Sequence, residues 1–295
     1  MFEIYIFVIK EIMRIVATPR DAMQGKKTFI PTKLKAEYIN CLLKVGFDTI
    51  DFGSFVSPKA IPQLSDTVEV LKMLDLSKTE TKLLAIVGNL KGAQIGSSFD
   101  EISYFGYPFS ISNTFLKLNI NSNVDGALGT ITEMQNLVSK SNKELVIYFS
   151  MAFGNPYGDE HSDELVIKAI EKLQNIGIKT ISLADTLGVG DNAVIANSFA
   201  QVKKEFPKIE LGMHLHVSLE EANGKIDAAY KAGCRYFDVA MLGMGGCPMS
   251  AHSMVGNLST EQLVEYLEYN KVEIPLNKER LEDAVYKAME VFRFD

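Results

Sequence analysis

The sequence predicts a (β/α)8 barrel, and three observations lead to that prediction. Short β-rich runs alternate with helical runs along most of the chain, which is the order that builds a parallel sheet covered by helices. There are eight strand-like runs, the number that closes such a sheet into a barrel. No Gly-x-Gly-x-x-Gly pattern follows the first run, so the competing open, doubly wound sheet lacks its usual marker.

Each predicted strand is a short β-rich run with turn residues on both sides. In chain order the strands are expected at residues 13–17, 47–52, 82–87, 101–104, 144–150, 179–183, 210–216 and 235–240. Helical periodicity lies between and after them, at residues 33–44, 67–76, 125–140, 163–175, 192–205, 219–232, 260–269 and 278–292. The last two of these are additional C-terminal helices. The third barrel helix is only weakly marked, by the glycine-rich residues 92–98. Asp66 and Ser259 each precede Glu or Gln by three residues, which predicts capping boxes.

Length and composition fit one globular domain. The chain has 295 residues, of which 47% are hydrophobic and 23% charged, and a barrel of this size forms a single domain over residues 1–295. Residues 1–12 form a possible N-terminal extension before Met13. The apolar run at residues 1–9 is shorter than the roughly 20 residues that span a bilayer. It also lacks the features of a signal peptide, so no membrane partner is expected.

Charge and cysteine content narrow the function classes further. The formal net charge is −7 and no Lys/Arg block is present, so nucleic acid is not an expected partner. The three cysteines are odd in number and far apart, without a secretory signal, which is typical of reduced thiols in a cytoplasmic protein. Cys41 and Cys234 lie in helical or strand patterning and are expected in the core.

Two histidines at the end of the seventh strand give the strongest site signal, because barrels carry function at the carboxyl ends of their strands. A spacing of two places the imidazoles of His214 and His216 on one side of the strand. Either they hydrogen-bond to neighbours inside the barrel, or they bind a metal. Asp21, after the first strand, and Asn257, after the eighth, would add two hard oxygens. Such a set suits Mg²⁺ or Mn²⁺, with Zn²⁺ less favoured.

Four further side chains are candidates for catalysis. Arg20, beside Asp21, either forms a salt bridge or stabilises an oxyanion. Asp51 ends the second strand and Asp185 ends the sixth, and both are candidate catalytic carboxylates. Cys247 lies in a glycine-rich loop, where it is either a small apolar turn residue or a thiol that transfers a proton when the loop closes.

Several motifs follow one another at these strand ends. They are Pro-Arg-Asp-x-x-Gln from residue 19, Ser-Phe-Val-Ser-Pro-Lys from 54, Asn-Leu-Lys-Gly from 89, Ser-Leu-x-Asp-Thr-x-Gly-Val-Gly from 182, His-x-His from 214, and Gly-x-Gly-Gly-Cys-Pro from 243 with Gly-Asn-Leu from 256. From about Ile15 to Leu267, the sequence resembles the 3-hydroxy-3-methylglutaryl-CoA lyase family. The Ser-Phe-Val-Ser-Pro-Lys and Gly-Gly-Cys-Pro elements are specific to that group. A wider group of metal-dependent barrel lyases and acyl-CoA condensing synthases shares Pro-Arg-Asp and His-x-His.

The resemblance implies a divalent-metal barrel lyase that splits 3-hydroxy-3-methylglutaryl-CoA into acetoacetate and acetyl-CoA by a retro-Claisen-type cleavage. The roles that go with it are leucine degradation and ketone-body metabolism. The implied metal ligands are Asp21, His214, His216 and Asn257. Arg20 would stabilise the enolate, and Cys247 would be the proton donor on a mobile loop. Either His214 or Asp21 would be the base that takes the hydroxyl proton of the substrate. The implied partners are a small-molecule acyl-CoA substrate and further copies of the chain, as a dimer or a larger homo-oligomer.

The chain departs from the family pattern at several positions. Ala22 and Met23 replace Gly-Leu, and Val16 stands where the first strand usually carries an acid. Asp51 replaces a glutamate, and Val217 replaces the aspartate that usually follows the second histidine. Loss of a partner behind a metal ligand can cost roughly 10–100-fold in affinity or activity.

Two alternative functions remain at this point. One is an acyl-CoA condensing synthase acting on a 2-oxo acid, such as isopropylmalate or homocitrate synthase. The long insert that carries Cys247 between Gly246 and Gly256 favours the lyase instead. The other alternative is a catalytically weak barrel that binds an acyl-CoA, motivated by Val217 and Asp51.

Overall fold

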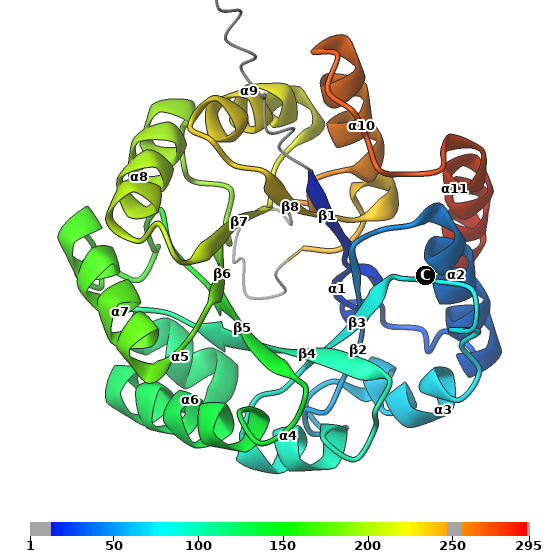
Figure 1. Ribbon diagram of the computed structural model, residues 1–295, viewed down its shortest axis with the longest axis horizontal. Coiled ribbons are helices and arrows are strands. Elements are labelled where there is room, and N and C mark those ends of the chain that lie inside the picture. The colour runs from blue at the N-terminus through cyan, green and yellow to red at the C-terminus, as the bar shows by residue number, and fades with distance from the viewer. Residues whose placement is uncertain (1–12, 247–254, 294–295) are drawn as a thin grey trace, which may run out of the picture.

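The computed structural model describes residues 13–246 and 255–293, which form a closed barrel of parallel strands surrounded by helices (Figure 1). Each strand pairs with the next in chain order, and β8 pairs with β1 to close the ring. The strands are β1 (Arg14–Ala17), β2 (Thr49–Ser54), β3 (Lys82–Ile86), β4 (Ile102–Phe109), β5 (Glu144–Phe149), β6 (Thr180–Asp185), β7 (Glu210–Leu215) and β8 (Tyr236–Val239). The predicted (β/α)8 barrel is confirmed.

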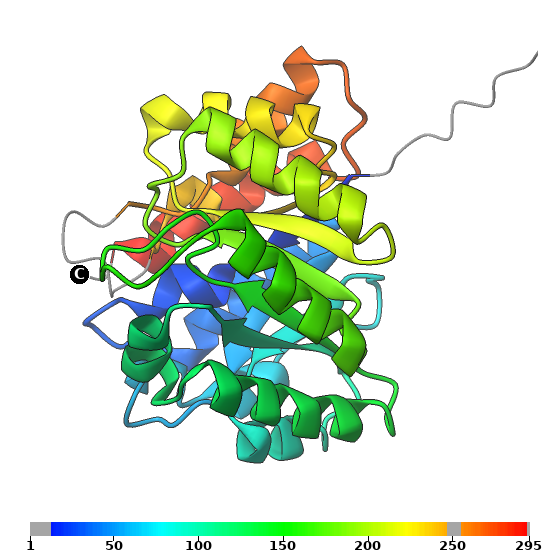
Figure 2. The same ribbon diagram turned by 90° about the vertical axis from the view of Figure 1, so that its left-hand side faces the viewer.

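Helices cover the outside of the barrel, and those of the second half of the chain lie alongside one another in Figure 2. The helices are α1 (Pro19–Gln24), α2 (Thr32–Val45), α3 (Thr67–Leu71), α4 (Leu90–Gly96), α5 (Asn113–Ile120), α6 (Val124–Val138), α7 (Asp163–Ile176), α8 (Asn192–Glu205), α9 (Leu219–Lys231), α10 (Thr260–Tyr269) and α11 (Lys278–Phe292), with 3-10 turns η1 (Pro62–Leu64) and η2 (Met241–Gly243). The additional C-terminal helices α10 and α11 are present as predicted, and α11 packs against α2. Among the described residues, no helix has the length and apolar character needed to cross a membrane.

Alternation along each strand separates two environments. On β7, Met213 and Leu215 belong to the large apolar core between the sheet and the helices. His214, between them, faces the inside of the barrel and lines a pocket there. The same alternation brings residues of neighbouring strands together inside the barrel, where Ile86 and Tyr148 belong to a smaller apolar cluster. The interior position of His214 therefore follows from the two-residue repeat of a strand.

β4 is longer than predicted, since it runs to residue 109 instead of ending at 104. Gly106 and Pro108 resemble turn residues in the sequence, yet both pair with β5 within the sheet. Packing explains the glycine: a Cβ at Gly106 would lie 2.5 Å from the side chain of Ile86 and 2.8 Å from that of Tyr148. A larger residue would fill the interior of the barrel at this level.

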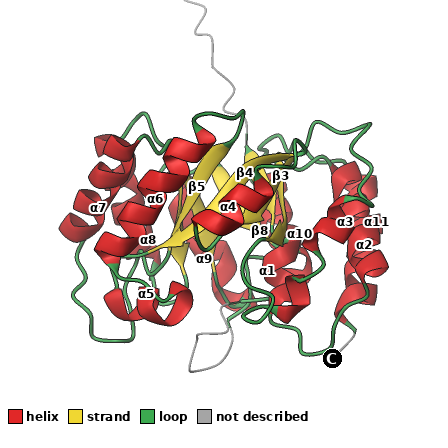
Figure 3. Cartoon of the chain, turned by 90° about the horizontal axis from the view of Figure 1, so that it is seen from below, coloured by secondary structure: helices red, strands yellow, loops and turns green. Residues whose placement is uncertain are grey.

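The short helix α5 was not predicted, and it lies at the same end of the barrel as α1 (Figure 3). It begins after Ser112, whose hydroxyl accepts a hydrogen bond from the backbone N–H of Phe115 at 3.0 Å. Asp159, in the loop after β5, accepts hydrogen bonds from Ser112 and from the backbone N–H and hydroxyl of Thr114. These contacts hold α5 over the carboxyl ends of β4 and β5.

Other local predictions need correction. The residues after β1 form the helix α1 with Pro19 in its first turn, where a proline is well tolerated. α3 ends at residue 71 instead of 76, and the capping box predicted at Asp66 is wrong. The carboxylate of Asp66 instead accepts a hydrogen bond from the buried ammonium of Lys35 at 2.8 Å. At Ser259 the hydroxyl does accept from the backbone N–H of Gln262, at 3.4 Å.

Candidate active site

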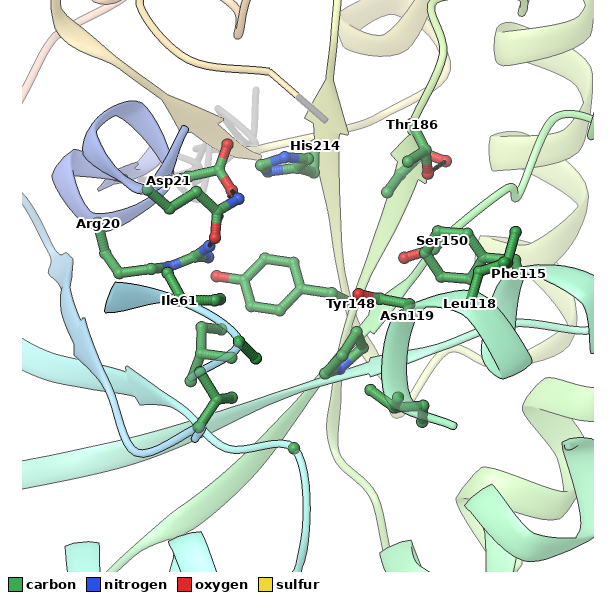
Figure 4. Close-up of a pocket in the computed structure, with 18 of the residues that line it drawn as sticks. Arg20, Asp21, Ile61, Phe115, Leu118, Asn119, Tyr148, Ser150, Thr186 and His214 are labelled. Carbon is green, nitrogen blue, oxygen red and sulfur yellow. Dashed lines mark hydrogen bonds and ion pairs between the residues drawn. The ribbon is translucent and has the colours of Figure 1, made fainter. Parts of the chain in front are cut away.

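A cavity of about 360 Å³ opens at the carboxyl ends of the strands, and Figure 4 shows its walls. Cationic, anionic and imidazole groups gather on one side, and α5 supplies apolar side chains to another. The lining residues are Arg20, Asp21, Gln24, Val56, Ala60, Ile61, Ile86, Gly88, Pro108, Phe115, Leu118, Asn119, Ile120, Tyr148, Ser150, Ala184, Thr186, His214 and His216. The cavity therefore combines a compact polar cluster with room for an organic substrate.

The two histidines face each other across a short gap, with 3.2 Å between their Nε2 atoms. Nδ1 of His214 lies 3.2 Å from the carboxylate of Asp238, and Nδ1 of His216 lies 2.7 Å from the carbonyl oxygen of Thr186. Carboxylate and carbonyl oxygens only accept hydrogen bonds, so both Nδ1 atoms carry the protons. Both Nε2 lone pairs then point at the same place, an arrangement that a cation would stabilise.

The two rings differ in their ionisation. Burial, and then the charge of His214, lower the pKa of His216 to about 4, so this ring is neutral at neutral pH. Burial is also the largest influence on His214 and opposes its charge, but the hydrogen bond to Asp238 and the charges of Asp238 and Asp21 together outweigh burial and raise the pKa. A nitrogen that is free of a proton is what a divalent cation requires from imidazole.

Asp21 and Asn257 complete the cluster. Asp21, His214 and His216 each offer a ligand atom within 4.8 Å of the others. The side-chain N–H₂ of Asn257 donates to Asp21 at 2.9 Å and to the carbonyl of Met244 at 2.8 Å. Its side-chain oxygen is buried and, among the described residues, has no hydrogen-bond partner. Two imidazole nitrogens, a carboxylate and an unsatisfied amide oxygen fit a divalent cation such as Mg²⁺ or Mn²⁺.

Arg20 is buried beside this cluster in α1. Its Nε lies 2.9 Å from Asp51 and its Nη2 2.5 Å from the same carboxylate, while Nη1 donates to Asp21 at 2.8 Å and Gln24 at 2.9 Å. Burial opposes its charge, but Asp51 and Asp21 outweigh burial, so the pKa of Arg20 is raised. Of the five N–H groups of a guanidinium, the described partners use one on Nε, two on Nη1 and one on Nη2. One Nη2 N–H is left for a substrate.

Asp51 does not lie at the open rim, where the sequence analysis placed it. Its side chain is fully buried inside the barrel and holds Arg20 with both oxygens. Burial raises the pKa of Asp51 to about 6, against the opposing charge of Arg20. Asp51 is not among the residues that line the cavity. The geometry therefore gives Asp51 a positioning role toward Arg20.

Asp185 is also not brought into the cavity. Its carboxylate accepts from Lys225 of α9 at 2.9 Å and from the backbone N–H groups of Val189 and Gly190. It thus holds the loop after β6, whose Thr186 carbonyl contacts His216. Cys247 lies outside the described residues. Cys234 is buried, as expected for a core thiol.

Sequence reasoning missed two residues of this site, Tyr148 and Asp238. The Tyr148 hydroxyl is buried without a hydrogen-bond partner among the described residues, and Figure 4 shows it directed toward Arg20. Its ring meets that of His214 edge to face, with 5.7 Å between centroids. Burial raises the pKa of Tyr148, so the phenol stays neutral and can donate a hydrogen bond. The signal that could have revealed Tyr148 and Asp238 is that both side chains face into the barrel, on β5 and β8. Recognising that direction requires the register of the sheet.

Val217 and Val16 show what two departures from the expected pattern mean in space. Val217 belongs to the apolar core outside the sheet, so the side chain at this position does not face the ligand cluster. Val16, by contrast, pairs in register with Asp238 of β8. An acid at position 16 would therefore lie next to Asp238 and not next to Asp21.

Together, the closed parallel barrel and the Asp-His-His cluster at its carboxyl rim define an enzyme of the metal-site (β/α)8 class. The model of the HMGL-like family matches residues 12–286, and the chain belongs to that family. A hydroxymethylglutaryl-CoA lyase of Bacillus subtilis is 32% identical over 265 residues, which cover 89% of this chain and 87% of the relative. The cytoplasmic 3-hydroxy-3-methylglutaryl-CoA lyase of Homo sapiens is 33% identical over 260 residues, covering 87% and 69%. The solved structure of an HMG-CoA lyase from Acinetobacter baumannii with coenzyme A and 3-methylmalate has a TM-score of 0.89 at 28% identity, covering 97% of this chain and 93% of that one.

Proposed function

We propose that this chain is a divalent-metal-dependent lyase that cleaves 3-hydroxy-3-methylglutaryl-CoA into acetoacetate and acetyl-CoA. The observation that carries the proposal is the convergence of two Nε2 lone pairs and an unsatisfied amide oxygen beside a buried guanidinium, inside the cavity of an HMGL-like barrel. The names of the relatives support the cleavage reaction over the condensing synthase. The intact ligand cluster supports an active enzyme over a silent binding barrel.

The four residues that would hold the cation are Asp21, His214, His216 and Asn257. When bound, Mg²⁺ or Mn²⁺ would supply positive charge that lowers the pKa of the substrate's hydroxyl group. With Nδ1–H given to Asp238 and Nε2 used as a ligand, His214 has no free nitrogen for a proton. Oδ1 of Asp21 accepts from Arg20 and Gln24, whereas Oδ2 accepts only from Asn257 among the described residues, so we propose Asp21, through Oδ2, as the acceptor of the hydroxyl proton.

Bond cleavage follows from loss of that proton. The oxygen becomes the ketone of acetoacetate, the bond between C2 and C3 breaks, and its electron pair forms the enolate of acetyl-CoA. The Nη2 N–H of Arg20 that Asp51 does not use would stabilise the growing charge on the enolate oxygen, as oxyanion-hole donors do. The neutral phenol of Tyr148 is a second donor in the same region. Cys247 remains the proposed source of the proton that converts the enolate carbon to the methyl group.

The experiment that tests this function uses protein stripped with EDTA and then supplied with Mg²⁺ or Mn²⁺. Incubation with 3-hydroxy-3-methylglutaryl-CoA should release acetyl-CoA and acetoacetate in equal amounts, each measured by its own coupled assay, and only with the cation present. No release at saturating levels of either cation would exclude the proposal. Condensation of acetyl-CoA with a 2-oxo acid by the same protein would favour the synthase.

Further expectations stay with this proposal. The acyl-CoA substrate enters the cavity at the carboxyl ends of the strands. The chain forms a homo-oligomer, and the whole chain is one domain. The enzyme acts in the cytoplasm, in leucine degradation or ketone-body metabolism.

A further inference from the structure

Asp238 sits behind His214, one step further from the cavity. It lies on β8, and its register partner on β7 is His214. The carboxylate is fully buried, and its Oδ2 atom lies 3.2 Å from Nδ1 of His214 and accepts from the hydroxyl of Ser182 at 2.8 Å. Three neighbouring strands thus contribute one inward-facing residue each to a linear chain that runs from Ser182 through Asp238 to His214.

Among the described residues, Asp238 is the one carboxylate that hydrogen-bonds to Nδ1 of His214. Asp51, another buried acid of the interior, is bound on both oxygens by Arg20. Val16 occupies the register position beside Asp238 on the first strand, so no second acid lies there. His216 differs, because its Nδ1 donates to the neutral carbonyl of Thr186. The Nδ1 atom of His214 therefore faces a carboxylate, whereas that of His216 faces an uncharged carbonyl oxygen.

We propose that Asp238 is a positioning residue for this site: it fixes the tautomer and the direction of the His214 ring and thereby sets how tightly the cation binds. The inference rests on the proposed metal site. A carboxylate only accepts hydrogen bonds, so it demands a proton on Nδ1 and leaves the lone pair on Nε2. An amide at this position can also donate, so both tautomers of His214 become possible. Partners behind metal ligands typically contribute about 10–100-fold to affinity.

The first test reads the ring itself, without metal or activity. The chain has four histidines, so long-range ¹H–¹⁵N NMR of the ¹⁵N-histidine-labelled protein can resolve them, with His214→Gln assigning the signal. At a fixed alkaline pH, where imidazole is neutral, the wild type should show His214 protonated on Nδ1 alone. Asp238→Asn should show a mixture of tautomers, while His216 keeps its Nδ1 proton. An unchanged His214 tautomer in folded Asp238→Asn would overturn the inference.

The second test measures Mn²⁺ binding by titration calorimetry. Asp238→Asn should weaken binding by roughly 10–100-fold. Ser182→Ala keeps the carboxylate but removes one hydrogen bond to it, so a loss of about twofold to tenfold is expected. Asp66→Asn is the matched control, because it neutralises a buried carboxylate that pairs with Lys35 outside the cluster. Its Mn²⁺ affinity should equal that of the wild type.

The outcomes separate the two proposals. Wild-type protein that binds no Mn²⁺ removes the metal site, and with it the proposed function. Wild-type protein that binds Mn²⁺ as tightly as folded Asp238→Asn leaves the proposed function standing and refutes the role of Asp238. If Asp238→Asn does not fold, Ser182→Ala decides alone: a weakened Mn²⁺ affinity supports the inference and an unchanged affinity rejects it.

Discussion

Replacing Arg20 by glutamine tests the central chemical step of the proposed reaction. The structure leaves one guanidinium N–H for the substrate, since Asp51, Asp21 and Gln24 use the others. Removing one oxyanion donor typically lowers kcat by about 10²–10³. Because the enolate carries more oxygen charge than the thioester, this loss should fall on kcat, with a much smaller change in KM.

The same substitution also affects stability, so the two effects have to be separated. Breaking a buried ion pair costs about 3–5 kcal/mol when one charge remains unpaired. Asp51 would be that charge in Arg20→Gln, although the raised pKa of its carboxyl allows it to take up a proton instead. Lys35→Gln provides the control, because it removes another buried cation from its carboxylate, Asp66, outside the cavity. It should lower the unfolding temperature and leave kcat unchanged.

The assay is steady-state cleavage of 3-hydroxy-3-methylglutaryl-CoA at saturating Mg²⁺, at a temperature where both variants are folded. Arg20→Lys should recover little activity, because a point charge cannot span Asp51 and Asp21 as the planar guanidinium does. A rise in KM alone for Arg20→Gln would make Arg20 a ground-state anchor. In that case the assignment of the enolate stabiliser would be wrong.

Three other predictions address the cation, the thiol and the loop that holds α5. His216→Ala should weaken Mn²⁺ binding by more than the roughly 10–100-fold loss expected when a residue behind a ligand is changed. His161→Gln, outside the cluster, should not weaken it. Equal Mn²⁺ affinities of His216→Ala and the wild type in titration calorimetry would remove His216 from the ligand set. Cys247→Ser should lower kcat by about 10²–10⁴ with unchanged metal content by elemental analysis; full activity would end its role in proton transfer. Hydrogen bonds from Ser112 and Thr114 lower the pKa of Asp159, so its stabilising contribution is present above the ordinary carboxyl pKa and is lost as pH falls through the lowered one. The wild type should therefore unfold at a higher temperature than Asp159→Asn near pH 7, and the difference should vanish in acid; a constant difference would contradict the shift.

Local sequence patterns predicted the features that depend only on residues close together in the chain. The two-residue repeat placed His214 and His216 on one face, and the order of runs predicted the barrel. The second half of β4 escaped prediction because Gly106 and Pro108 read as a turn in isolation. Their place in a strand depends on Ile86 and Tyr148, which come from other strands.

Register explains the remaining differences at the site. Asp51 and Asp185 look alike in sequence, as acids at strand ends, yet one faces into the barrel toward Arg20 and the other outward toward Lys225. Asp238 gains its position from the pairing of β7 with β8, which no local pattern encodes. Tyr148 likewise matters because β5 brings its hydroxyl into the same interior as Arg20.

The hydrogen bond from Asn257 to Asp21 joins residues that are 236 positions apart in the chain. It lies where the first and last strands meet, at the seam that closes the ring. Because these two side chains come from opposite ends of the chain, they meet only when the ring is closed. A cation that binds here would hold the first and last parts of the barrel together. A ligand at 100 times its Kd adds about 2.7 kcal/mol to the stability of the folded form that binds it. The same ion that prepares the substrate would thereby resist the opening of the barrel.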